Sequence, residues 1–366
     1  MKSLYIKNFK NIRELTIDRL AKVNLIVGKN SVGKSTLLEA LSVYLAQGDR
    51  FWLNELMDSR GELLMAKNDK DEESFNSQCY LSLFTGREEN YSKDYSIEIG
   101  ELDKDEEAVK INQVYIVREE EDALEGGTVL RTRVFSEENL EELTNVVERG
   151  LAVAYGNKKV IIPYRRLMSR MAVPYRLKFQ YVHTVDFNTE KNAMLFDNIS
   201  LSPEEKYIIQ ALQIIHPQIT RINFLNMGYS TRYRKETRIP FVTMEGDKNK
   251  YLLSSMGDGI NRILTIILAM LNCKGGTLLL DEFETGLHYS VQDELWKIIF
   301  MLAEELDVQV FATTHSNDCV NSFARINAKD KGMVIRLEER KGNIKAVIYT
   351  DPDELVFATA NKIEIR

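Results

Sequence analysis

Residues 28–36, GKNSVGKST, combine two glycines with a lysine and hydroxyl side chains at the spacing of a phosphate-binding loop. In such a loop, backbone N–H groups surround phosphate oxygens and the lysine contacts the β- and γ-phosphates. Lys34 fits that lysine, Ser35 fits the Mg²⁺ ligand, and Thr36 is a weaker second hydroxyl. We therefore predict a site for a nucleoside triphosphate and Mg²⁺, formed by Gly28, Lys29, Asn30, Ser31, Val32, Gly33, Lys34, Ser35 and Thr36.

Two adjacent acids supply a second part of the predicted site. In the string LLLDEFETGLH, a buried strand from Thr277 to Leu280 is followed by Asp281 and Glu282. One carboxylate at a strand end can hold a metal ion, and its neighbour can take a proton from water. We predict that Asp281 binds Mg²⁺ together with Ser35 and that Glu282 is the catalytic base.

A third candidate follows the apolar run VQVFATTHS, which ends in Thr313, Thr314 and His315. A polar side chain at such a strand end can contact the γ-phosphate and respond to its loss. A lone loop histidine usually has no such role, but a place after a strand and downstream of two acids favours one. We predict that His315 is a second catalytic residue.

The phosphate-loop pattern indicates phosphate binding only where it lies between a strand and a helix. Residues 23–27 form a short apolar run typical of a buried strand, and leucines recur at helical spacing after the loop. This context matches the motif. Lys34 and Asp281 are too far apart for a compact GTPase or kinase, and the chain has no Asn-Lys-x-Asp guanine reader. A GTPase is therefore not expected.

Composition limits the class of protein. The 366 residues suffice for a large core in two lobes, and the formal net charge of −7 argues against coating nucleic acid by bulk charge. Three widely spaced cysteines predict neither a zinc site nor a disulfide framework. The sequence MKSLYIKNFKN does not read as a signal peptide, and the apolar run 263–271 is too short to cross a bilayer. We expect a cytoplasmic protein with no membrane contact.

The order of these motifs resembles a known family. A strand-rich start (SLYIKNFKNIRELTI), an early phosphate loop, a late LLLDE and a final TTHS resemble the ABC-type heads of RecF, SMC proteins and OLD nucleases. The strings DEFETGLH and SSMGDGINRIL resemble most the stand-alone AAA-family ATPases related to OLD, found in bacterial anti-phage systems. The resemblance covers residues 1–50 and 250–366 well and the middle only loosely. It implies ATP as the nucleotide.

The resemblance also implies a site shared between two subunits. In such heads a glycine-bearing signature of a second subunit meets the γ-phosphate, and LSSMGDGINR matches it with Ser255 (or Ser254), Gly257 and Gly259. A serine-capped helix N-terminus is the alternative, and both readings can hold together. ETGLH would cross between subunits, with Glu284 and His288 as polar tips. For the glutamine loop of ABC heads the candidate is Gln78.

The middle of the chain has the sequence patterns of both helices and strands. Two helices are predicted at 136–151 and 201–219, the second capped by Ser202. No heptad series is long enough for an SMC-like arm. Strands are predicted at 79–84, 95–99, 111–117 and 128–135.

Basic and aromatic residues are interleaved between Arg149 and Thr184, a stretch without Asp or Glu. Such a segment suits nucleic-acid contact through phosphate pairing and base stacking. The alternative is a solvated face that meets the acidic segment 101–125 of a second copy. The cations concerned are Lys158, Lys159, Arg165, Arg166, Arg170, Arg176 and Lys178.

These observations predict an α/β, ABC-type P-loop ATPase head in two lobes. Residues 1–135 and 260–366 would form the nucleotide-binding lobe, with an antiparallel β meander on the N-terminal side and a central sheet; residues 136–259 would form a helical lobe. The expected function is ATP hydrolysis by a homodimer or higher oligomer that senses, or scaffolds and regulates, a separately encoded effector such as a nuclease or toxin in anti-phage defence. A RecF-like DNA clamp in repair and an ATP-binding scaffold with little turnover are the alternatives.

Overall fold

The computed structural model describes residues 1–62, 72–123, 127–135, 148–164, 178–184, 188–230, 235–327 and 331–349. The chain divides into two compact units. Unit 1 contains Met1–Leu20, Glu39–Leu177 and Glu339–Ala346, and unit 2 contains Ala21–Leu38, Lys178–Glu338 and Val347–Arg366.

A six-stranded sheet forms the centre of unit 2. Its order is β16-β15-β3-β14-β13-β9, and the neighbours from β15 to β9 are parallel. The carboxyl ends of these parallel strands therefore meet at one edge, where the predicted site residues follow β3, β13 and β14. The strands are β3 (Val23–Gly28), β9 (Phe179–Val182), β13 (Thr277–Leu280), β14 (Gln309–Thr313), β15 (Gly332–Arg340) and β16 (Asn343–Tyr349).

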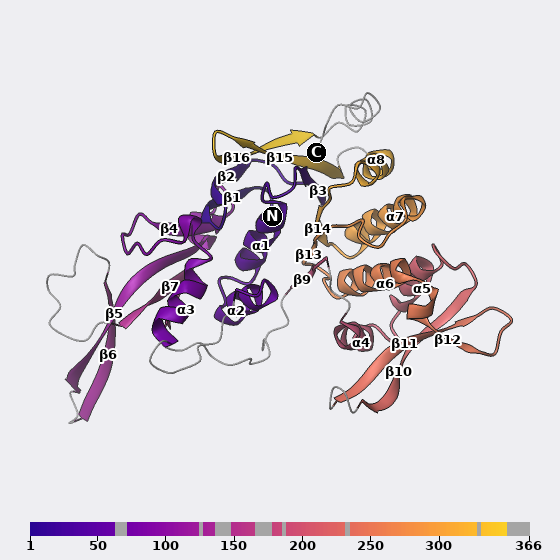
Figure 1. Cartoon of the computed structure of the whole chain (residues 1–366), viewed down its shortest axis with the longest axis horizontal. Helices are drawn as coiled ribbons and strands as arrows, with labels where there is room; N and C mark the ends of the chain where they lie inside the picture. The colour runs from indigo at the N-terminus through magenta and orange to yellow at the C-terminus, as the bar shows by residue number, and fades with distance from the viewer. Residues whose placement is uncertain are drawn as a thin grey trace. The chain divides into compact units, whose positions relative to one another are not determined.

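Helices α6, α7 and α8 line one side of this sheet (Figure 1). α6 is apolar almost all round and is buried along most of its length, as expected for a helix enclosed by a core. On α7, the ring of Trp296 stacks on Phe283 with centroids 4.0 Å apart, so the segment after β13 is anchored in the core. The helices are α4 (Thr189–Asp197), α5 (Glu205–Leu212), α6 (Asp258–Leu271), α7 (Tyr289–Glu305) and α8 (Asn317–Ile326), with α1 (Lys34–Leu45) following the phosphate loop.

Unit 2 also holds a small antiparallel sheet in the order β10-β11-β12. Ile222 pairs with Val242, and Val242 pairs with Tyr251. The last strand leads into the short 3-10 helix η4 (Leu253–Met256) and then directly into α6. The strands are β10 (Ile219–Ser230), β11 (Lys235–Met244) and β12 (Lys250–Leu252).

An antiparallel sheet forms the framework of unit 1. Its order is β2-β1-β4-β5-β7-β8, and β6 pairs with β5. The strands are β1 (Leu4–Phe9), β2 (Ile12–Ile17), β4 (Ser96–Gly100), β5 (Val109–Ala123), β6 (Gly127–Phe135), β7 (Glu148–Tyr155) and β8 (Lys158–Pro163). The described helices of this unit include residues 39–45 of α1, α2 (Arg50–Ser59) and α3 (Glu72–Leu81), with 3-10 turns η1 (Thr85–Arg87) and η2 (Asp105–Glu107).

Several predicted elements differ in the structure. Residues 79–84, predicted as a strand, hold the end of α3 and a turn, because a short buried apolar run fits either periodicity. Residues 148–151, predicted as helix, belong to β7, which pairs with both β5 and β8; residues 136–147 lie outside the described residues. α5 begins at Glu205, and Ser202 accepts a hydrogen bond from the N–H of Glu204 ahead of the helix. The other predicted strands in the middle of the chain are present as β4, β5 and β6.

The two units do not follow the expected lobe boundaries. Residues 136–259, expected to form a helical lobe, contribute β7 and β8 to the sheet of unit 1. The same range contributes β9, α4, α5 and the small sheet to unit 2. The physical reason is strand pairing, since β7 pairs with β5 while β9 pairs with β13. Within the described residues, no helix is both long enough and apolar enough to span a bilayer.

Candidate functional site

The phosphate loop has the predicted strand–loop–helix form. β3 ends at Gly28 and α1 begins at Lys34, while Lys29, Asn30 and Ser31 lie exposed between them. Val32 and Gly33 are buried, and Thr36 is partly buried in the first turn of α1. The loop thus presents its tip to solvent and anchors its base in the core, which is the arrangement that anion binding requires.

Lys34 spans the base of this loop. Its ammonium group donates hydrogen bonds to the carbonyl oxygens of Gly28 (2.7 Å) and Lys29 (3.0 Å). Burial lowers the pKa of Lys34, whereas the nearby carboxylates of Glu282, Glu284 and Asp281 act in the opposite direction. A half-buried cation whose charge is disfavoured by desolvation gains from an added anion such as a phosphate.

Asp281 follows β13 and connects the phosphate loop with the end of β14. Its Oδ1 accepts a hydrogen bond from Ser35 Oγ (3.0 Å) and another from Thr313 Oγ1 (2.7 Å). The Asp281 residue is only 4% exposed. The structure therefore brings together the two predicted Mg²⁺ ligands, Ser35 and Asp281, although nearly 250 residues of sequence separate them.

This pair fits Mg²⁺, which usually takes one or two protein oxygens and completes its shell with water and substrate phosphates. Among the residues that the structure describes, no group of three or more His, Cys, Asp or Glu side chains is arranged to hold a metal ion by itself. A hydroxyl and one carboxylate beside a phosphate loop suit a metal that arrives with a nucleotide.

Glu282 has an unusual backbone for a glutamate. Its φ is +50°, in the left-handed region that side-chain-bearing residues seldom adopt. Its N–H donates to Thr313 Oγ1 (2.8 Å), and its carboxylate accepts a hydrogen bond from Thr285 Oγ1 (3.2 Å). The side chain is 37% exposed, so the predicted base is held in place yet reachable by water.

His315 lies between β14 and α8, beside two acids. Its ring Nδ1 is 3.1 Å from Glu284 Oε1 and 4.0 Å from Glu282 Oε1, and its backbone N–H donates to Glu284 (2.9 Å). Glu284, expected as a polar tip of the loop that crosses between subunits, has a side chain that is only 10% exposed and contacts His315 of its own chain. Its contact with a second subunit stays a prediction. His288 is exposed, but its ring caps the N-terminus of α7.

The signature-like segment begins at η4 and continues into α6. Ser254 and Ser255 are both exposed, and Ser255 Oγ donates to the carbonyl of Leu252 (2.6 Å). Neither serine caps the helix: Gly257 is the N-cap and forms no side-chain cap. The alternative reading of a serine-capped helix is therefore wrong.

The two glycines of this segment have different surroundings. Gly257 has φ +101°, and a Cβ added there would meet nothing within 4 Å. At Gly259 an added Cβ would lie 2.8 Å from the carbonyl oxygen of Gly286, so close packing within the chain already requires this glycine. A contact of Ser255, Gly257 or Gly259 with a nucleotide remains a prediction.

Sequence reasoning named Thr313 only as part of a polar strand end, and it did not find Arg262. The buried hydroxyl of Thr313 binds both Asp281 and Glu282. Arg262 on α6 is 2% exposed and donates to backbone carbonyls at the ends of β9 and β13. The available signal was one arginine in the apolar run INRILTIILAML, because arginine is rarely buried without partners.

Other predicted residues lie elsewhere or outside the described residues. Gln78 is exposed on α3 in unit 1, and Arg149 on β7 forms an ion pair with Glu89 at 2.9 Å. Lys158 and Lys159 are exposed on β8, and Lys178 is exposed just before β9. The four arginines at 165, 166, 170 and 176 fall within 165–177, outside the described residues.

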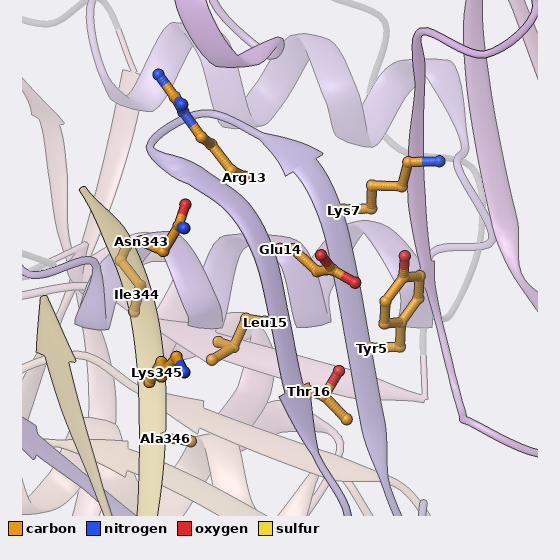
Figure 2. A pocket seen from close by; sticks show the side chains of 10 residues that line it. All are labelled: Tyr5, Lys7, Arg13, Glu14, Leu15, Thr16, Asn343, Ile344, Lys345 and Ala346. Carbon is orange, nitrogen blue, oxygen red and sulfur yellow. The ribbon is translucent and has the colours of Figure 1, made fainter. Parts of the chain in front are cut away.

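A separate hollow of about 630 Å³ lies in unit 1 between β1, β2 and the first part of β16, residues 343–346, which belongs to this unit (Figure 2). Lys7 on its wall donates to Glu98 (3.1 Å), and this hydrogen bond raises the pKa of Lys7. None of the predicted nucleotide ligands lines it. The lining residues are Tyr5, Lys7, Arg13, Glu14, Leu15, Thr16, Asn343, Ile344, Lys345 and Ala346.

The sequence is similar to a known protein family and to known proteins. Residues 1–142 and 181–320 match the AAA ATPase domain family. The chain belongs to this family. An ATP/GTP phosphatase of Helicobacter pylori is 26% identical over 347 residues, which cover 89% of this chain and 88% of the relative. The DNA replication and repair protein RecF of Clostridioides difficile is 31% identical over 140 residues, or 38% of this chain and 32% of RecF.

The fold of this AAA ATPase is that of an SMC head. A crystal structure of an SMC head bound to the C-winged helix domain of ScpA superposes with a TM-score of 0.50 at 13% identity, and the match covers 95% of this chain and 98% of the head. The predicted ABC-type head is thereby confirmed as the fold class. The phosphate loop and the acidic strand end lie in the matched ranges of the AAA ATPase domain.

Proposed function

We propose that this chain hydrolyses ATP, with Glu282 as the base that activates the attacking water. The observation that carries the proposal is the hydrogen bond of 3.0 Å between Ser35 Oγ and Asp281 Oδ1. It brings the phosphate loop to the acidic strand end, so that a metal ligand and the neighbouring glutamate serve one bound nucleotide. Mg²⁺ would supply charge neutralisation of the β- and γ-phosphates there.

Each residue of the site has a chemical task under this proposal. Lys34 would exchange its loop carbonyls for phosphate oxygens, and Ser35 and Asp281 would hold Mg²⁺. Glu282 takes a proton from water through a carboxylate that is partly exposed. His315, held by Glu284, senses the γ-phosphate from the end of β14.

The complete site would require a second copy of the chain. Ser254, Ser255 and Gly257 are exposed, and the space around the Gly257 Cα is open. An exposed helix N-terminus with a glycine cap leaves backbone N–H groups free to meet a γ-phosphate. We therefore propose a homodimer, or a higher oligomer, that closes over ATP.

Nucleotide binding is tested by Lys34→Ala. The substitution removes a charge-assisted contact, so affinity for a fluorescent ATP analogue should fall roughly 10- to 100-fold, as expected for a hydrogen bond to a charged group of about 1.5–3 kcal/mol. Lys274→Ala is the control, because this exposed lysine lies outside the phosphate loop, just before β13, and pairs with Glu204. Wild-type affinity for Lys34→Ala, measured by fluorescence titration, would contradict the site.

The biological role proposed for the ATPase is to regulate a separately encoded effector in anti-phage defence. The support is the resemblance of DEFETGLH and SSMGDGINRIL to ATPases of such systems. The neighbouring gene identifies the candidate effector. Phage plating on cells that carry both genes should rise to the unprotected level when Glu282→Gln replaces the wild-type ATPase; equal protection by both forms would refute an ATP-driven role.

DNA binding in repair is a second candidate. It is supported by the similarity to RecF and by the exposed Lys158 and Lys159 at the start of the basic segment. Replacing Arg165, Arg166 and Arg170 by Gln should weaken DNA binding and reduce the log–log salt slope by about one unit per lost phosphate contact. An unchanged slope for the purified chain favours the alternative, a protein–protein face.

A further inference from the structure

A buried arginine connects the start of α6 to the proposed catalytic acids. Arg262 is only 2% exposed, although the residues that follow it on α6 are almost all apolar. Burying a guanidinium costs free energy unless it is well hydrogen-bonded, so the acceptors of its hydrogen bonds indicate the role of the buried charge. Among the described residues, the hydrogen bonds of Arg262 go to three backbone carbonyl oxygens.

The guanidinium binds the ends of two neighbouring parallel strands. Nη1 donates to the carbonyl of His183 (2.8 Å), just after β9. Nη2 donates to the carbonyls of Asp281 (2.7 Å) and Glu282 (3.0 Å), just after β13. A planar fork of donors can hold several carbonyls at once, which the single ammonium of a lysine does less well.

These contacts act on the strained peptide of the proposed base. Glu282 has φ +50°, a strained conformation that persists only where neighbouring groups enforce it. Thr313 Oγ1 holds the N–H of Glu282, and Arg262 holds its C=O. Thr313 also binds the Asp281 carboxylate, so it cannot fix the Glu282 carbonyl as well.

The same helix carries the signature-like segment. Arg262 lies within the second turn of α6, whose N-cap is Gly257. Gly259 packs so closely on the carbonyl of Gly286 that an added Cβ would lie 2.8 Å from it. The first turns of α6 therefore contact residues 281–286 at two points, through Arg262 and through Gly259.

We propose that Arg262 is a positioning residue that sets the backbone of Glu282 for base chemistry and ties it to the first turns of α6. The assignment of Glu282 as the base is taken from the proposed function. Arg262 touches no reacting group in this scheme. Moving α6 would move the carbonyl of Glu282 with it, so the segment that meets a second subunit also sets the geometry of the base.

The test is Arg262→Gln, with Arg262→Lys as the conservative variant. Affinity for an ATP analogue should stay within about 3-fold of wild type, because the described hydrogen bonds of Arg262 go to backbone carbonyls after β9 and β13, and none goes to the phosphate loop or to the Asp281 carboxylate. The turnover at saturating ATP should fall roughly 10- to 100-fold, the loss typical of a base displaced by about 1 Å. Arg262→Lys should recover part of this loss.

Thr265→Val is the matched control. Thr265 lies on the same helix, is 5% exposed, and binds Asn192 and the carbonyl of Asn261, away from residues 281 and 282. Amide hydrogen exchange supplies a readout independent of turnover. Peptides containing residues 280–284 should exchange faster in Arg262→Gln but not in Thr265→Val.

A double-mutant cycle with Glu282→Gln decides between positioning and a general structural role. If Arg262 acts through Glu282, the double variant should hydrolyse ATP no more slowly than Glu282→Gln alone. Equal fractional losses in both backgrounds, or wild-type turnover by Arg262→Gln, would overturn the proposal. Should Arg262→Gln fail to fold, the cycle is run with Arg262→Lys.

The cycle also separates this proposal from the proposed function. Wild-type turnover by Glu282→Gln itself would refute the base assignment. The exchange measurement would then still decide whether Arg262 holds the backbone of residues 281 and 282, since unchanged exchange in Arg262→Gln refutes that claim on its own.

Discussion

A chain carrying Glu282→Gln should bind ATP as tightly as wild type and hydrolyse it about 10²–10⁴-fold more slowly, the usual cost of removing a general base. Glutamine keeps the shape of the side chain and can still accept a hydrogen bond from Thr285, but it cannot take a proton from water. Asp281, the proposed metal ligand, is untouched. Binding is measured by titration of a labelled analogue and hydrolysis by single-turnover phosphate release.

The control is Glu294→Gln, a carboxylate on α7 that is about half exposed and pairs with Lys297. It should leave both quantities unchanged. Turnover of Glu282→Gln at the wild-type rate would show that another group is the base. If the wild-type chain also releases no phosphate in a single turnover, the chain is an ATP-binding scaffold, the third alternative that the sequence leaves open.

The parts of this site that could be predicted from sequence are those with a local pattern. The phosphate loop is one continuous segment, so its strand, glycines and helix can be recognised together. Asp281 and Glu282 follow an apolar run, and parallel strands place such ends at one edge of a sheet. The hydrogen bond between Ser35 and Asp281 is the expected consequence.

The parts that could not be predicted depend on non-local pairing and on the backbone. Arg262 binds three backbone carbonyl oxygens, and because every residue has a carbonyl, the sequence does not indicate which ones act as acceptors. The left-handed φ of Glu282 is equally hidden, because the residue type does not favour it. The expected lobes differ from the units because β7 and β9 join different sheets, and no local signal chooses between distant partner strands.

Mixing two inactive variants should restore ATP hydrolysis if each nucleotide is bound by residues of two chains. Gly257→Glu places a carboxylate on the signature-like segment, where it would face the phosphates of a partner's nucleotide. The space around Gly257 is open, so the substitution causes no clash within the chain. This variant should bind the ATP analogue normally, yet neither dimerise over ATP nor hydrolyse it.

Gly246→Glu is the matched control, because Gly246 also has positive φ (+73°) and nothing within 4 Å of an added Cβ. It lies in the turn between β11 and β12 and is not part of the signature-like segment. Both glutamates lie at positive φ, but Gly257 (φ +101°, ψ 162°) lies in a region that side-chain-bearing residues adopt even less readily than the left-handed helical one. Both variants are therefore first required to unfold at the wild-type temperature. A difference in ATP-dependent dimerisation between them, measured by light scattering, therefore reports on position rather than on strain.

In a mixture of Gly257→Glu and Lys34→Ala chains, each mixed dimer keeps one site with an intact phosphate loop and an intact signature. An equal mixture should recover roughly a quarter of wild-type activity, since half of the dimers in a two-fold assembly are mixed and each has one good site of two. If hydrolysis requires both sites of a dimer to be intact, the mixture shows no recovery of ATP hydrolysis. The same mixture in a Glu282→Gln background then reports only the assembly of mixed dimers. Mixed dimers that form only with ATP support the shared site. Gly257 in contact with the nucleotide of its own chain, seen in a structure of the ATP-bound protein, would exclude it, because the signature would then complete the site within one subunit.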